Sequence, residues 1–182
     1  MNEESLLEQS ALTSLPTSFR VIGIGEATKE VIETVKSYRY DCVSATVLTE
    51  PFECIPTDED KMVIIVAKDN EDHANSIANT FHEAGVLTIG LLDNADLECY
   101  DGVMVETSCT EYPDLIKAFL QPIATQGLIA YDFNDLQTTL TDAKHFFIKS
   151  ETGHGNERVA ESIGFIKSTL TSSLLNKIER LS

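Results

Sequence analysis

The apolar runs of this chain recur at short intervals and are separated by segments of helix length. The runs at 19–25, 42–48, 61–68, 86–93 and 101–107 predict strands, and the segments 26–38, 70–84 and 112–125 predict helices. A further strand is expected at 143–152, a final helix from about residue 156, and the proline-bearing connection 50–60 is a candidate edge strand. Strands that alternate with helices predict an α/β fold with a doubly wound, mostly parallel, Rossmann-like sheet.

The run KMVIIVAK at 61–68 is the most apolar stretch of the chain. A strand without polar alternation is typical of the centre of a parallel sheet, where both faces are covered. The 182 residues suit a single domain with its own core. Residues 1–18 are polar and are expected to form a tail or a short helix before the fold begins.

The chain carries 30 acidic and 13 basic residues, for a formal net charge of -17. This charge repels phosphate backbones and anionic lipids, so neither nucleic acid nor a membrane is expected as a partner. The N-terminal residues are acidic, and no apolar run reaches the roughly 18 residues of a membrane-spanning helix. A cytoplasmic location is therefore expected, with the four cysteines, which form no C-x-x-C pair, as reduced and buried thiols.

The stretch VIGIGEATKE at 21–30 has the form of a strand, a glycine turn and a helix start. In parallel sheets such a turn faces the ligand crevice, which makes Gly23 and Gly25 candidate phosphate contacts. Glu26 stands where a phosphate would approach, and its carboxylate can itself interact with the helix dipole. A tight acidic turn without a ligand is the alternative, and the acid that a dinucleotide site needs about 20 residues later is absent.

The order of segments after residue 18 resembles the tubulin/FtsZ superfamily, in the form of a shortened bacterial FtsZ. The segment 19–35 is similar to the family's first strand, glycine loop and helix, and 60–93 to the strands and helix around its signature loop. GLIAYDFND at 127–135 matches the family's Gly-Leu-x-Asn-x-Asp-Phe-x-Asp loop except at Ala130, and Gly155, Arg158 and Glu161 match a later helix start. The resemblance implies a domain at 19–143 and, at 144–182, a remnant strand and helix of a second domain.

The chain departs from the family where the phosphates of GTP would bind. The family's glycine-rich signature loop is replaced by KDNEDHANS, which brings in Asp69, Glu71 and Asp72. Each carboxylate near a triphosphate costs on the order of 1 kcal/mol or more. The resemblance therefore implies a degenerate nucleotide site at Gly23, Gly25 and Asn70, with no cofactor expected, or GTP with magnesium if the site still works.

Asp132 and Asp135 occupy the positions of the acids that, in FtsZ, reach the nucleotide held by the next subunit and orient the attacking water. The resemblance implies that both act only in trans, on a neighbouring subunit. A helix N-cap followed by an acidic third position explains the same spacing without any catalytic role. The partners implied are an FtsZ-type GTPase or further copies of this chain.

No other pattern in the sequence predicts a catalytic or metal site as clearly. The four histidines lack the spacing of zinc ligands, so no metal is expected, and Ser150 with His154 lacks the nucleophile elbow of a hydrolase. Three functions stay open: a degenerate FtsZ-like partner or regulator of a cell-division GTPase, a divergent but working GTP-binding protein, and an α/β domain for another small molecule. The first implies that the chain is no efficient GTPase by itself.

Overall fold

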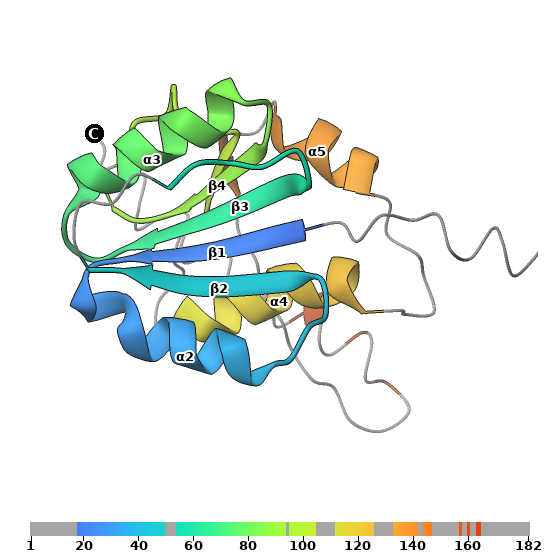
Figure 1. The fold of residues 1–182 in the computed structure, drawn as a ribbon. Coiled ribbons are helices and arrows are strands. Elements are labelled where there is room, and N and C mark those ends of the chain that lie inside the picture. Colours follow the sequence, from blue (N-terminus) through green and yellow to red (C-terminus); the bar gives the residue numbers. More distant parts are fainter. Residues whose placement is uncertain are drawn as a thin grey trace, which may run out of the picture.

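The computed structural model describes residues 18–49, 54–93, 95–104, 112–125, 133–141 and 144–146, together with residues 157, 160, 163 and 164. Within these ranges the chain forms one six-stranded sheet with helices on both faces (Figure 1). The elements in chain order are β1 (Ser18–Ile24), the 3-10 helix η1 (Glu26–Thr28), α2 (Lys29–Ser37), β2 (Val43–Leu48), β3 (Asp60–Ala67), α3 (Glu71–Glu83), β4 (Leu87–Leu91), β5 (Gly102–Met104), α4 (Tyr112–Ala124), α5 (Phe133–Thr141) and β6 (Lys144–Phe146).

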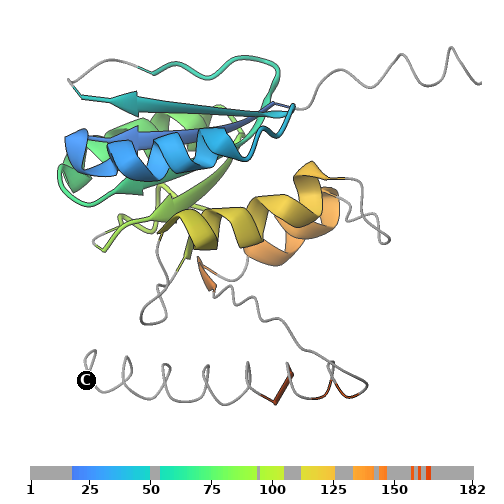
Figure 2. The same cartoon turned by 90° about the horizontal axis from the view of Figure 1, so that it is seen from below.

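The strands follow the order β2-β1-β3-β4-β5-β6, and every neighbouring pair is parallel. Parallel neighbours cannot be joined by a tight turn. Helices lie in the connections from β1 to β2, from β3 to β4 and from β5 to β6, whereas β4 leads to β5 with no helix among the described residues. Figure 1 shows α3 on one face of the sheet, with α2 and α4 on the other. In Figure 2 the same molecule is seen from the side of α2 and α4. The predicted doubly wound parallel sheet is confirmed.

Each face of the sheet has its own apolar core. Val63 of β3 packs with Phe81 of α3 on one face, and Ile64 packs with Ile32 of α2 and Ile116 of α4 on the other. All five side chains are buried. Because β3 contributes to both cores, the prediction that the run at 61–68 forms a central strand is confirmed. No helix within the described residues is long and apolar enough to cross a bilayer.

The structure departs from the sequence prediction in the connection before β3. The described part of this connection, residues 54–59, forms no strand and therefore no edge of the sheet. The reason is Asp60, whose side chain accepts hydrogen bonds from the backbone N–H and the hydroxyl of Thr57 and so folds the segment into a turn. A turn of this kind uses the backbone groups that a strand would need for a ladder.

Several predicted segments extend beyond the described residues. The strands expected at 101–107 and 143–152 are seen as β5 and β6, and the flanking residues 105–107 and 147–152 lie outside the described ranges. Most of the final helix expected from about 156 also lies outside them. β6 pairs with β5 in the single sheet. The division into a domain at 19–143 and a second-domain remnant at 144–182 stays a prediction.

Candidate functional site

Backbone groups of the turn after β1 are hydrogen-bonded to other groups of the chain. Gly25 has φ 83° and ψ 161°, a conformation that is open to glycine and strained for other residues. Its N–H donates to the Leu48 carbonyl at 2.8 Å, and its carbonyl accepts from the Thr28 N–H at 3.1 Å and the Thr28 hydroxyl at 2.8 Å. The Lys29 N–H donates to the Glu26 carbonyl. Three N–H groups of this turn, those of Gly25, Thr28 and Lys29, are therefore already bonded to carbonyls within the chain.

Gly23 allows α2 to pack closely on β1. A Cβ atom at Gly23 would lie 2.4 Å from Thr28 Oγ1 and 2.6 Å from Ile32 Cγ1. Both of these side chains are buried, so the space in front of Gly23 is filled by protein. The close approach explains the glycine by packing alone, and its predicted contact with a nucleotide stays a prediction.

Asn70 lies beside Gly25, although the two are 45 positions apart in the sequence. A Cβ atom at Gly25 would lie 3.2 Å from Asn70 Nδ2. Asn70 precedes α3 with φ 59° and ψ 41°, a left-handed conformation that asparagine tolerates, and its side chain makes no capping hydrogen bond. The structure thus brings together two of the three predicted nucleotide positions, at the carboxyl ends of β1 and β3.

Acidic side chains surround this end of the sheet. Asp69 and Asp72 are exposed after β3, Glu71 is half-buried, and Glu26 is exposed on the neighbouring turn. Lys68 lies in the same loop, but its ammonium group faces the ring of Tyr112, with Nζ 5.2 Å from the ring centre. A triphosphate at this edge would meet more negative than positive charge, which opposes its binding.

The loop that carries the predicted trans-acting acids leads into α5. Asp135 is exposed in the first turn of this helix, while Asp132 lies outside the described residues. Phe133 fixes the start of α5 against the sheet, because its ring stacks on that of Phe19 with the centroids 5.7 Å apart. Phe19 lies near the start of β1, so Asp135 lies at the end of the sheet opposite to Gly25 and Asn70.

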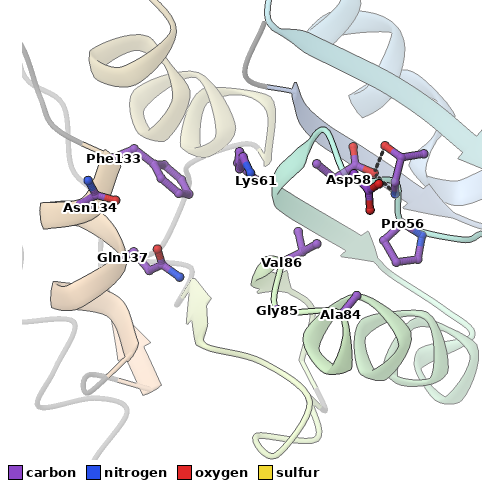
Figure 3. Close-up of a pocket in the computed structure, with 11 residues that line it drawn as sticks. Pro56, Asp58, Lys61, Ala84, Gly85, Val86, Phe133, Asn134 and Gln137 are labelled. Carbon is purple, nitrogen blue, oxygen red and sulfur yellow. Dashed lines mark hydrogen bonds between the residues drawn. The ribbon is translucent and has the colours of Figure 1, made fainter. Parts of the chain in front are cut away.

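A cavity of about 600 Å³ opens between the start of α5 and the starts of β3 and β4 (Figure 3). Its walls combine polar side chains with small apolar surfaces. They are formed by Pro56, Thr57, Asp58, Asp60, Lys61, Ala84, Gly85, Val86, Phe133, Asn134 and Gln137. Ligands of open parallel sheets bind at the carboxyl ends of the strands, whereas this cavity lies at the amino ends.

The ion pair between the partly exposed Arg20 and the buried Asp60 holds one wall of this cavity in place, and the sequence patterns did not indicate it. Arg20 Nε donates to Asp60 Oδ1 at 2.7 Å, and only 1% of the Asp60 side chain is exposed. Burial alone would raise the pKa of Asp60, but the hydrogen bonds from Thr57 and from Arg20 outweigh it, so the pKa lies below its usual value. An acid directly before an apolar run is the only local signal for this contact.

The histidines and cysteines form no further site within the described residues, where no group of three or more metal-binding side chains occurs. His82 Nδ1 lies 3.5 Å from Asp101 Oδ2, the nearest approach to an acid–base pair. Cys99 is buried as predicted, while Cys42 and Cys54 are only partly buried. Burial raises the pKa of the Cys42 and Cys99 thiols, which keeps them protonated. Cys109, Ser150 and His154 lie outside the described residues.

Comparison with known proteins identifies the fold. No family model and no curated protein matches the chain by sequence. An FtsZ dimer from M. jannaschii, described as empty, matches with a TM-score of 0.58 and 13% identity, over 80% of this chain and 66% of that one. A point mutant of FtsZ from M. jannaschii matches with a TM-score of 0.65 and 14% identity, over 94% of this chain and 74% of that one. The chain has the fold of FtsZ, as the resemblance predicted, and at these identities the likeness concerns the fold alone.

Proposed function

We propose that this FtsZ-like chain does not use GTP efficiently and acts through protein contacts, as a partner or regulator of a polymerising cell-division GTPase. The observation that carries the proposal is the turn at Gly25. Its glycine and Asn70 still meet, but the N–H groups of Gly25, Thr28 and Lys29 are bonded within the chain, and the loop after β3 carries carboxylates. A phosphate site needs the reverse, with free N–H groups and little negative charge.

The opposite end of the sheet supports the contact role. In the family, acids at this end reach the nucleotide of the next subunit, and Asp135 is exposed there at the start of α5. A chain that keeps this end and has lost the nucleotide end can dock on a GTPase subunit without offering a pocket to the next one. Such a chain would terminate a filament.

The proposal predicts that the purified chain does not bind GTP at micromolar concentration. If the three carboxylates after β3 each oppose binding by about 1 kcal/mol, their sum weakens the affinity roughly a hundredfold. Isothermal titration with GTP and magnesium measures this directly. The variant Asp69→Asn/Asp72→Asn removes two exposed charges and serves as the matched comparison. Saturable micromolar binding by the unmodified chain would establish the alternative, a divergent but working GTP-binding protein.

The proposal also predicts that the chain lowers both GTP turnover and the sedimented mass of an FtsZ-type GTPase. The variant Asp132→Ala/Asp135→Ala removes the acids of the contact, and we expect at least a tenfold loss of potency, which corresponds to about 1.4 kcal/mol of binding free energy. The variant Glu30→Ala/Asp93→Ala removes the same charge from exposed positions at the other end of the sheet and is expected to act like the unmodified chain. Equal potency of all three proteins, or no effect of any, would contradict the proposed contact.

A further inference from the structure

We infer that β2 is the dimerisation edge of this protein, and that it pairs with the β2 strand of a second copy of the chain in antiparallel orientation. Among the residues that the structure describes, β2 is an end strand of the sheet, and its one hydrogen-bonded neighbour is β1. Figure 1 shows α2 running alongside it on one face. This inference concerns a different surface from the one proposed to contact a GTPase, and it does not depend on that function.

Natural edge strands usually carry features that prevent pairing, such as charged residues, proline, a bulge or a very short length. The sequence of β2, VSATVL, has no charged residue and no proline, and its six residues pair with β1 in continuous register. The other end strand of the described sheet, β6, begins with the charged residue Lys144. Charge protection is thus present in the described part of β6 and missing in β2.

The backbone groups that face outward from β2 follow from its pairing with β1. The Cys42 carbonyl accepts from the Phe19 N–H of β1 and the Leu48 carbonyl from the Gly25 N–H just after β1, at 2.8 Å in each case. Since successive residues of a strand alternate in direction, Val43, Ala45 and Val47 point their backbone groups to the open edge. The Val43 N–H is taken up by the Tyr40 carbonyl. Ala45 and Val47 retain outward donors for a new neighbour.

An antiparallel pair centred on Ala45 matches like side chains on both faces of the extended sheet. Ala45 would face Ala45 of the second copy and exchange two hydrogen bonds with it. Val43 would face Val47 on the same side, where all three residues are partly buried against the core under α2. Ser44 would face Thr46 on the other side, where both are exposed and their hydroxyls can pair.

The charges on α2 select a second copy as the occupant. A groove of about 260 Å³ runs between β2 and α2 and is lined on the helix side by Glu26, Lys29, Glu33 and Lys36. All four are exposed. Within one copy they form the ion pairs Glu26–Lys29 and Glu33–Lys36, along η1 and α2. When two α2 helices lie antiparallel about residue 31, Glu26 faces Lys36 of the other copy and Lys29 faces Glu33. Every acid then meets a base.

The centres of symmetry of the helix and of the strand coincide. Gly25 lies level with the end of β2. From Gly25 to residue 31 the chain rises about 10 Å, at about 2.0 Å per residue through the 3-10 helix η1 and about 1.5 Å per residue through α2. The same distance is about three residues along a strand, which leads from Leu48 back to Ala45. One twofold axis can therefore pass both between the α2 helices and between the two Ala45 residues, as a closed dimer requires.

Sedimentation velocity of the purified chain without nucleotide or partner tests the inference, with a concentration-dependent dimer as the expected result. Ala45→Pro removes the central outward N–H and should make the chain monomeric. Lys29→Glu should weaken the dimer at least tenfold without touching the core, and Lys29→Glu/Glu33→Lys should restore it, because the facing charges become opposite again. A monomeric unmodified chain, or a dimer that neither single variant weakens, overturns the inference.

Cysteine crosslinking fixes the register independently of stability. In the pairing centred on Ala45, residues 44 and 46 of opposite copies are a close, non-hydrogen-bonded pair with Cα atoms about 4.5 Å apart, within disulfide range. Ser44→Cys/Thr46→Cys should therefore form a covalent dimer under oxidation, and Thr46→Cys alone should not. Crosslinking by Thr46→Cys alone would shift the axis to residue 46 and overturn the assignment to Ala45. The unmodified chain controls for its native cysteines.

Discussion

Asp60→Ala is expected to lower the free energy of unfolding by about 3 kcal/mol, the largest effect of any single side chain considered in this protein. The change leaves the Arg20 guanidinium, with 24% of its side chain exposed, without its carboxylate partner, and leaves the Thr57 N–H without its acceptor. Urea unfolding followed by circular dichroism measures the loss. Asp58→Ala, an exposed acid from the same loop, should change the stability by less than about 0.5 kcal/mol. Equal losses for the two variants would show that the Arg20–Asp60 pair is not a stabilising contact.

The same pair predicts how stability depends on pH. The folded-state pKa of Asp60 lies below the unfolded value of about 3.9, since hydrogen bonds from Thr57 and from Arg20 overcome the effect of burial. A depressed folded pKa contributes stability above the unfolded pKa, and the contribution is lost as the pH falls through the folded pKa. The stability difference between the unmodified chain and Asp60→Asn should therefore be constant from about pH 5 to 7 and should shrink below about pH 4.

Gly23→Ala is expected to lower the free energy of unfolding by about 1–3 kcal/mol, in the absence of any nucleotide. The added Cβ would lie 2.4 Å from Thr28 Oγ1 and 2.6 Å from Ile32 Cγ1, so α2 must move away from β1. Thermal and urea unfolding report the change. A stable Gly23→Ala protein would show that the contact between β1 and α2 adjusts freely, and that packing does not account for this glycine.

Gly164→Ala is the matched control for this prediction. Among the described residues, no atom lies within 4 Å of a Cβ placed at Gly164. The same chemical change should therefore be neutral, or slightly stabilising through the lower entropy of the unfolded chain. A comparable loss in both variants would argue against close packing as the cause.

Most of the fold could be predicted from the sequence because its signals are local. An apolar run of strand length predicts a strand, and apolar residues at helical spacing predict a helix, without knowledge of the neighbouring elements. Val31, Ile32 and Val35 are such residues in α2. The exception among the described residues is the connection 54–59, where Asp60 imposes a turn through Thr57. Nothing in the local pattern shows that the carboxylate turns back on its own loop.

The candidate site was less predictable, because its residues meet only in the folded chain. The sequence indicated Gly25 and Asn70 separately, but their contact depends on β1 and β3 being neighbours. The sequence did not indicate the packing at Gly23, where Thr28 of η1 and Ile32 of α2 lie closest, and the predicted nucleotide contact of this glycine stays a prediction. The pairing of Arg20 with Asp60 joins residues 40 positions apart, and no periodicity carries that information.

The strand order has a consequence for how the chain is built during synthesis. After β1, each of β3, β4, β5 and β6 is placed next to a strand that has already been made, so the sheet can lengthen in one direction as the chain emerges. The two faces are completed at different times. α3 follows β3 at once, whereas α4, which supplies Ile116 and Leu120 to the opposite core, comes only after β5. On that face only α2 is in place when β3 and β4 are made, so part of the apolar surface under α4 stays uncovered until α4 has been synthesised.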